Sequence, residues 1–255
     1  MPLVYAAVTP HAPVLAPTLA PEHHLLVAPT IQALQQIGHE LRAANVELIV
    51  VLTPHAAGDQ QSFVAYTNQS LAVDLSAFGD YKTNRSIPGA VVFAQHVRAQ
   101  ADRDHVPMQL QSAQLLDYGV GVPWLAGAWP DVPCLPIATY GQSDEMLYRL
   151  GELLAEVAHQ QPTRIAIIAS ADLVQRDEGA RMADRPMPWE REVATALRTG
   201  QRGAIPAPAP TDPCGRAPIV GLLSAVAAMQ PQGTILSFQA PFRVGYLVAE
   251  CHLRR

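Results

Sequence analysis

The sequence predicts an α/β fold: a single domain over residues 1–255, with a central mixed, mainly parallel sheet flanked by helices on both faces. Two apolar runs rich in β-branched residues, Ile49–Leu52 and Ile165–Ala169, are typical of strands buried inside a sheet. Stretches of strand character alternate with stretches of helical periodicity, which is the pattern of a sheet covered by helices. The chain has 255 residues, 49% of them apolar, so it can bury a sizeable core.

The elements are expected to follow one another along the chain without a domain boundary. Apolar residues recur at helical spacing between residues 26 and 41, and Ser143 is a suitable N-cap for a later helix. We expect helices at residues 26–41, 87–101, 124–129, 143–159, 188–197 and 218–229. We expect strands at residues 3–8, 49–52, 63–66, 71–75, 132–138, 165–169, 234–238 and 244–249, and loops at the glycine-rich residues 117–123 and the proline-rich residues 204–213.

Composition and charge exclude several classes of function. The net charge is −5 and no basic cluster is present, so we expect no nucleic-acid partner. No apolar run is long enough to span a bilayer, and the first residues lack the basic region of a signal peptide, so we expect no membrane association. The three cysteines, Cys134, Cys214 and Cys251, do not suggest a disulfide framework, which favours a cytoplasmic protein with reduced thiols.

A Thr-Pro-His sequence occurs twice, each time directly after a predicted strand. Residues 9–11 follow the strand at residues 3–8, and residues 53–55 follow the strand at residues 49–52. Proline stops a strand, so His11 and His55 come just past the carboxyl ends, where open α/β sheets bind their ligands. Either histidine alone would more often be a satisfied core or loop residue. The repeated context favours two metal-ligating imidazoles at one edge of the sheet.

Cys214 is the candidate for a third ligand. It lies where a loop enters a predicted helix, with Pro218 suited to the first turn. The helix dipole and the nearby Arg216 both favour the thiolate that a metal requires. A small buried cysteine is the alternative interpretation. Glu250 is a rival ligand, although its alternation with apolar neighbours favours a surface position. No nucleophile elbow, phosphate loop or dinucleotide fingerprint is present.

Four short motifs, taken in order, resemble a known family. They are residues 9–13, 53–55, 170–173 and 214–219, and together they resemble the class III extradiol ring-cleavage dioxygenase (LigB-like) superfamily, closest to its Memo or AmmeMemoRadiSam system protein B branch. The resemblance implies one α/β domain with a central mixed sheet. In ring-cleaving members two histidines and a glutamate hold Fe(II), at which a catecholate and dioxygen react. In Memo-like members a cysteine takes the place of the glutamate, and Cys214 matches that cysteine.

The chain departs from the ring-cleaving pattern at two positions. Tyr118 occupies the place of a histidine in an Asp-His-Gly loop, and Gln175 falls where a second histidine would follow the strand at residues 165–169. Ring cleavage needs a group that moves the catechol proton, and histidine suits this because its pKa lies near neutrality. Gln175 cannot titrate and Tyr118 is a poor base. Asp172 remains as a base or an orienting residue, although an aspartate after a strand is often a helix cap.

Three functions are compatible with this pattern. The first is an oxidoreductase resembling extradiol dioxygenases, with Fe(II) held by His11, His55 and Cys214, or with Zn or Cu as alternatives, acting on a small aromatic or phenolic substrate. The second is a Memo-like metal-binding or interaction protein without ring cleavage. The third is a metal-assisted hydrolase. A homodimer is compatible with all three. Because the usual acid/base histidines are replaced, we expect weak or no classical catechol cleavage.

Overall fold

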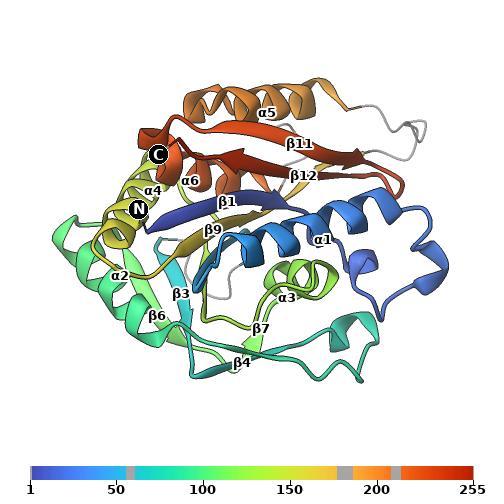
Figure 1. The fold of residues 1–255 in the computed structure, drawn as a ribbon, viewed down its shortest axis with the longest axis horizontal. Helices are drawn as coiled ribbons and strands as arrows, with labels where there is room; N and C mark the ends of the chain where they lie inside the picture. Colours follow the sequence, from blue (N-terminus) through green and yellow to red (C-terminus); the bar gives the residue numbers. More distant parts are fainter. Residues whose placement is uncertain (1, 56–60, 177–185, 208–213, 255) are drawn as a thin grey trace.

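The computed structural model describes residues 2–55, 61–176, 186–207 and 214–254. Among these residues, nine strands form one mixed sheet (Figure 1). They are β1 (Leu3–Thr9), β2 (Leu48–Thr53), β3 (Phe63–Thr67), β6 (Met108–Ser112), β8 (Cys134–Ala138), β9 (Ile165–Ser170), β10 (Asp172–Gln175), β11 (Gln232–Gln239) and β12 (Val244–His252). The strand order is β10-β12-β1-β9-β2-β8-β3-β6, with β11 paired to β12. A smaller sheet contains β4 (Ser70–Val73), β5 (Ser86–Pro88) and β7 (Leu115–Leu116).

The centre of the large sheet is parallel. β1, β9, β2 and β8 pair in parallel, while β12 pairs with β1, and β3 with β8, in antiparallel fashion. The register places Thr9 opposite Ser170, and Thr53 opposite Ala138. The carboxyl ends of the four central strands are therefore aligned at one edge of the sheet, which is where open α/β sheets place their sites.

Helices cover both faces of the large sheet (Figure 1). They are α1 (Ala28–Ala43), α2 (Val91–Arg103), α3 (Tyr118–Ala126), α4 (Asp144–His159), α5 (Pro188–Thr199) and α6 (Arg216–Val226). Because successive strand residues point to opposite faces, Ile49 and Val51 belong to the core cluster that contains residues of α1 and α3, whereas Val50 and Leu52 belong to the cluster that contains residues of the other four helices. Short 3-10 helices lie at Pro13–Leu15, Pro21–His23, Ser76–Phe78, Arg202–Ala204 and Ala227–Met229.

The predicted fold class is confirmed, and several elements differ from the expectation. Ser143 caps α4 by accepting a hydrogen bond from the backbone N–H of Met146, as expected. The glycine-rich stretch forms most of α3 and is not a loop, because Asp117 caps its start and the helix is almost wholly buried. Asp172 begins strand β10 and is not a helix cap. The expected helix start at Ile87 lies in β5, and α2 begins at Val91.

The last six residues of the expected proline-rich loop, 208–213, lie outside the described residues. Within the described ranges, no helix is both long and apolar enough to cross a membrane.

Candidate metal centre

Three side chains from distant parts of the chain converge at the carboxyl edge of the parallel strands. His11 follows β1, His55 follows β2, and Cys214 lies two residues before Arg216, the first residue of α6. One ligand atom of each lies within 4.8 Å of the others, and the Cys214 Sγ is 3.6 Å from the His11 Nε2. Bonds of about 2.0–2.3 Å to one ion place ligand atoms roughly 3–4.5 Å apart, so little movement is needed for all three to share an ion.

A glycine permits the approach of Cys214. The Gly215 backbone N–H donates to the Asp172 carbonyl at 3.0 Å, which ties the start of α6 to the start of β10. A Cβ atom at Gly215 would lie 2.6 Å from both the Cβ of Ala171 and the Asp172 carbonyl oxygen. A larger residue here would push the loop away from the sheet and take the thiol with it.

His11 is fixed in the form that can bind a metal. Its Nδ1 lies 2.9 Å from the Ser170 hydroxyl, and that hydroxyl donates its proton to the carbonyl of Gly119. The Ser170 oxygen therefore accepts from Nδ1–H, which leaves the lone pair on Nε2 facing Cys214. Burial, and then repulsion from His55, lowers the pKa of His11 to about 3, so the ring stays neutral at pH 7.

His55 is fixed in the same tautomer by a different partner. Its Nδ1 lies 2.9 Å from an Asp117 carboxylate oxygen, and the other oxygen accepts from the Thr53 hydroxyl at 3.3 Å. The ring donates Nδ1–H to the carboxylate and keeps Nε2 free for a metal. A Cβ atom at Gly119 would lie within 2.9 Å of atoms of all three of these residues. The glycine therefore lets the start of α3 carry Asp117 against the His55 turn.

Asp172 and Tyr118 border the three candidate ligands. The Asp172 carboxylate accepts from the His11 backbone N–H at 2.9 Å and lies 3.8 Å from the His11 Nε2; burial raises its pKa to about 7. The Tyr118 ring centroid lies 4.4 Å from that of His55 and 5.7 Å from that of His11. Burial, and then the charge at Cys214, raises the pKa of Tyr118 to about 12, so the phenol remains a hydrogen-bond donor at pH 7.

Gln175 and Glu250 lie apart from this group. Gln175 is exposed at the far end of β10, where it pairs with Val244. Within the described part of the chain, its side chain makes no hydrogen bond to the histidines or to the thiol. Glu250 accepts a hydrogen bond from the Tyr5 hydroxyl at 3.4 Å and is largely buried in β12, so it is neither a member of the group nor the surface residue expected.

Sequence reasoning did not assign a role to Ser170, Asp117 or Gly119. A signal was present for each, because Ser170 ends a strong buried strand, and Asp117 and Gly119 flank Tyr118 in the motif that replaces Asp-His-Gly. The sequence shows these residues in their motifs, but it does not show the hydrogen bonds that orient the rings of His11 and His55. Those bonds depend on how α3 packs against the sheet.

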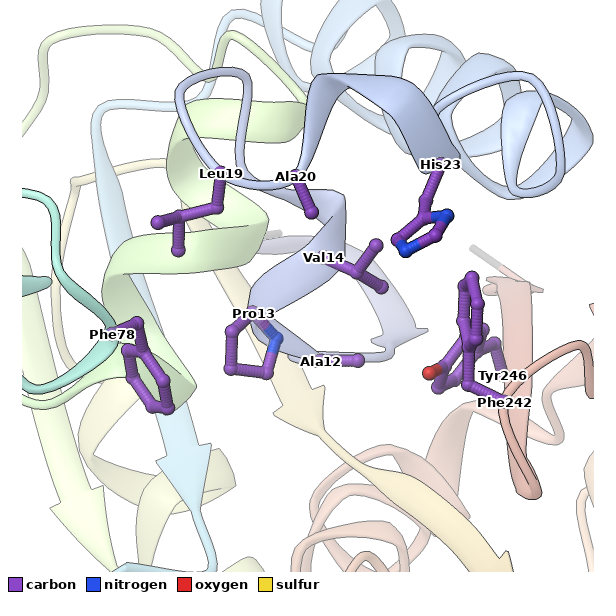
Figure 2. A pocket seen from close by; sticks show the side chains of 9 residues that line it. All are labelled: Ala12, Pro13, Val14, Leu19, Ala20, His23, Phe78, Phe242 and Tyr246. Carbon is purple, nitrogen blue, oxygen red and sulfur yellow. The ribbon is translucent and has the colours of Figure 1, made fainter.

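Two cavities, each of about 330 Å³, lie beside the group. The apolar cavity (Figure 2) is lined by Ala12, Pro13, Val14, Leu19, Ala20, His23, Phe78, Phe242 and Tyr246. The more polar cavity, which we call the His55 cavity, is lined by His55, Tyr66, Gln111, Ala113, Leu115, Leu116 and Asp117. Both are large enough to hold a small organic ligand.

Comparison with known proteins gives one family. The chain is 20% identical over 256 residues to Protein CA_C1420 of Clostridium acetobutylicum, a similarity that covers 93% of this chain and 55% of that protein, so the chain spans about half of that relative. The crystal structure of the uncharacterized protein JW3007 from Escherichia coli K12 matches with a TM-score of 0.66 at 17% identity, over 98% of this chain and 100% of that chain, and this shows a shared fold. A family model described as the catalytic LigB subunit of aromatic ring-opening dioxygenase matches residues 5–211. Because this match covers most of the chain, the chain belongs to the LigB family.

Proposed function

We propose that this chain binds one Fe(II) ion through the Nε2 atoms of His11 and His55 and the thiolate of Cys214, and that it acts as an oxygenase on a phenolic or other small aromatic compound. The observation that carries this proposal is the convergence of the three donor atoms, with both imidazoles held as neutral Nε2 ligands. Two imidazoles and a thiolate suit Fe, Zn or Cu, and membership of the LigB family favours iron. Bound iron would supply open coordination positions and the redox chemistry that dioxygen activation needs.

The side chains around the ion would orient the ligands and handle protons. Ser170 and Asp117 hold the two rings in place, as partners of metal-bound histidines commonly do. Asp172 is the proposed proton acceptor for a phenolic hydroxyl, since its carboxylate lies beside His11 and Gln175 cannot titrate. Tyr118 is proposed to donate a hydrogen bond to the substrate, because its phenol stays protonated.

A second candidate is metal binding without ring cleavage. It is favoured by the two replaced histidines: Tyr118 is a weak base and Gln175 is exposed and apart from the group. A third candidate, a zinc-dependent hydrolase, would use the same three ligands with an open fourth position, which is the usual form of a catalytic zinc site.

Oxygen uptake by metal-reconstituted protein separates these candidates. The protein is purified anaerobically and loaded with Fe(II), Zn(II) or Cu(II). Each form is screened against catechols for oxygen consumption and ring-cleaved product, and against aryl esters for hydrolysis. We expect slow consumption that requires Fe(II) and a catechol, and that disappears in Cys214→Ala. Stoichiometric iron binding with no oxygen consumption above the protein-free rate would favour the second candidate, and ester hydrolysis by the Zn(II) form alone would favour the third.

A further inference from the structure

The apolar cavity has the chemistry of a site for an uncharged organic group. Most of its lining is aliphatic or aromatic, and none of its nine described lining residues is Lys, Arg, Asp or Glu. The polar side-chain groups among these residues are the ring of His23 and the hydroxyl of Tyr246. A carboxylate placed there would lose its hydration without meeting a fixed cation among these residues, which is costly. An aryl or alkyl group would instead be transferred from water to apolar walls, which is favourable.

Aromatic rings form two sides of this cavity. Figure 2 shows Phe78 on one side and Phe242 with Tyr246 on the other, with Pro13 and Ala12 between them. These rings come from a 3-10 helix, a loop and strand β12, so the fold brings them together from separate segments. Phe78, a large apolar residue, is 39% exposed at the rim of the cavity. Rings on opposite sides of a cavity can pack against an inserted aromatic group by edge or by offset face.

The same walls contact the residues assigned to the metal centre. Ala12 follows His11 directly, and the Phe78 ring centroid lies 5.0 Å from that of Tyr118. Tyr246 stands opposite Asp172 in the pairing of β10 with β12, and burial and then the Asp172 charge raise the pKa of Tyr246 above its usual value. A ligand whose reacting end lies at the metal centre could therefore extend its other end into the apolar cavity.

We propose that the apolar cavity binds an uncharged aryl or alkyl substituent of the substrate, so that the chain selects phenolic compounds with such a substituent over those with a carboxylate. This inference rests on the proposed function, because it places the reacting end of the ligand at the three metal ligands. The His55 cavity is the rival location. Its walls include the Asp117 carboxylate, the Gln111 amide and the Tyr66 phenol, which suit a polar group better than an alkyl or aryl one.

The test compares three probes that share a catechol head. Catechol, biphenyl-2,3-diol and 3,4-dihydroxybenzoate are titrated anaerobically into Fe(II)-loaded and metal-free protein, and binding is measured by calorimetry. We expect biphenyl-2,3-diol to bind at least about 10-fold more tightly than catechol in both forms, since a second ring adds a large buried apolar area. The dihydroxybenzoate is expected to bind no more tightly than catechol.

Two filled-cavity variants locate the bound ring. Val14→Trp fills the apolar cavity and is expected to reduce the affinity for biphenyl-2,3-diol at least 10-fold while catechol affinity and metal content stay unchanged. Ala113→Trp fills the His55 cavity and is the matched control, expected to leave the preference for the second ring intact. Phe242→Ala removes one aromatic wall without overfilling the cavity, so it serves as a second test if Val14→Trp does not fold. It is expected to lower the affinity for biphenyl-2,3-diol about 3-fold or more.

Equal affinities for catechol and biphenyl-2,3-diol would overturn the inference, and so would loss of the preference in Ala113→Trp with none in Val14→Trp and Phe242→Ala. Failure of the proposed function looks different. In that case the protein would bind no iron or consume no oxygen, while the metal-free protein still preferred the probe with the second ring.

Discussion

The two Thr-Pro-His turns have the same sequence but different environments. His11 is 1% exposed and its Nδ1 donates to a neutral hydroxyl, that of Ser170. The His55 side chain is 25% exposed and its Nδ1 donates to a charged carboxylate, that of Asp117. The local sequence places each histidine at the end of a central strand, whereas the neighbouring elements decide its burial and its partner. His11 is therefore part of the buried core as well as of the candidate site, while the partly exposed His55 belongs mainly to the candidate site.

The largest difference between the two turns is expected in stability. His11→Ala should lower the free energy of unfolding of the metal-free protein by about 2–4 kcal/mol, because it leaves a buried cavity and removes the group that donates to the Ser170 oxygen. His55→Ala should cost about 1 kcal/mol or less, because the ring is partly solvated. Urea unfolding of both variants measures this, and equal costs would contradict the distinction between the two histidines.

Catechol turnover should change more on substitution of Tyr118 than on substitution of Gln175. Tyr118→His places an imidazole beside His55 and is expected to raise catechol turnover by up to about 10²-fold, since a general acid/base contributes about that much. Gln175→His should change turnover less, because that side chain is exposed and apart from the group. The double variant should gain less than the product of the two, as groups on one proton path are not additive.

Steady-state oxygen uptake with saturating Fe(II) and catechol measures these changes. Fast cleavage by the unaltered protein, unchanged by either substitution, would show that Asp172 suffices as the base. No gain in any variant would favour the metal-binding candidate without ring cleavage.

The partners of the two rings should differ in their effect on metal affinity. Asp117→Asn removes the negative charge behind His55 and is expected to weaken metal binding about 10-fold or more, the usual range for such partners. Ser170→Ala removes a neutral acceptor behind His11 and should weaken it less, with a larger share of its effect on folding. Competition titrations against a chelator give both affinities. A larger loss in Ser170→Ala would reverse the roles assigned to the two partners.

The smallest expected effect, on stability, concerns the segment that carries Cys214, the candidate third ligand. Arg216, two residues after Cys214, pairs with Asp144 at the start of α4, with contacts of 2.5 and 2.8 Å, and holds the pKa of that carboxyl below its usual value. The ion pair therefore contributes stability above about pH 3.8, the ordinary value, and loses it as the pH falls through the lowered pKa of the folded state. The Asp144 side chain is 44% exposed, so Asp144→Asn should cost under about 1 kcal/mol at pH 7.

The difference between the wild type and Asp144→Asn should shrink at pH 3 in urea unfolding. A difference that stays constant or grows in acid would show that the Asp144 carboxylate does not stabilise the start of α6 through its charge.

The histidines at the two strand ends could be predicted from the sequence. The residues that hydrogen-bond to their rings, Ser170 and Asp117, could not. His11 and His55, whose ring centroids are 4.8 Å apart, come together because two buried strands each end in a Thr-Pro-His turn. The position of Cys214 at a helix start was also visible in the sequence. The helical state of α3 was not, because glycines disfavour helices and only tertiary burial and the Asp117 cap overcome this. Strand β6 could not be predicted either. It is an edge strand whose residues after Met108 are exposed, so its sequence lacks the apolar run of a buried strand.

X-ray absorption spectroscopy at the metal edge of anaerobically loaded protein tests whether His11, His55 and Cys214 bind one ion together. We expect nitrogen ligands from two imidazoles and one sulfur ligand at about 2.3 Å, with the sulfur contribution absent from Cys214→Ser. A spectrum without sulfur in the unaltered protein, or one that keeps its sulfur and imidazole contributions in the combined His55→Ala and Cys214→Ala variant, would contradict this expectation.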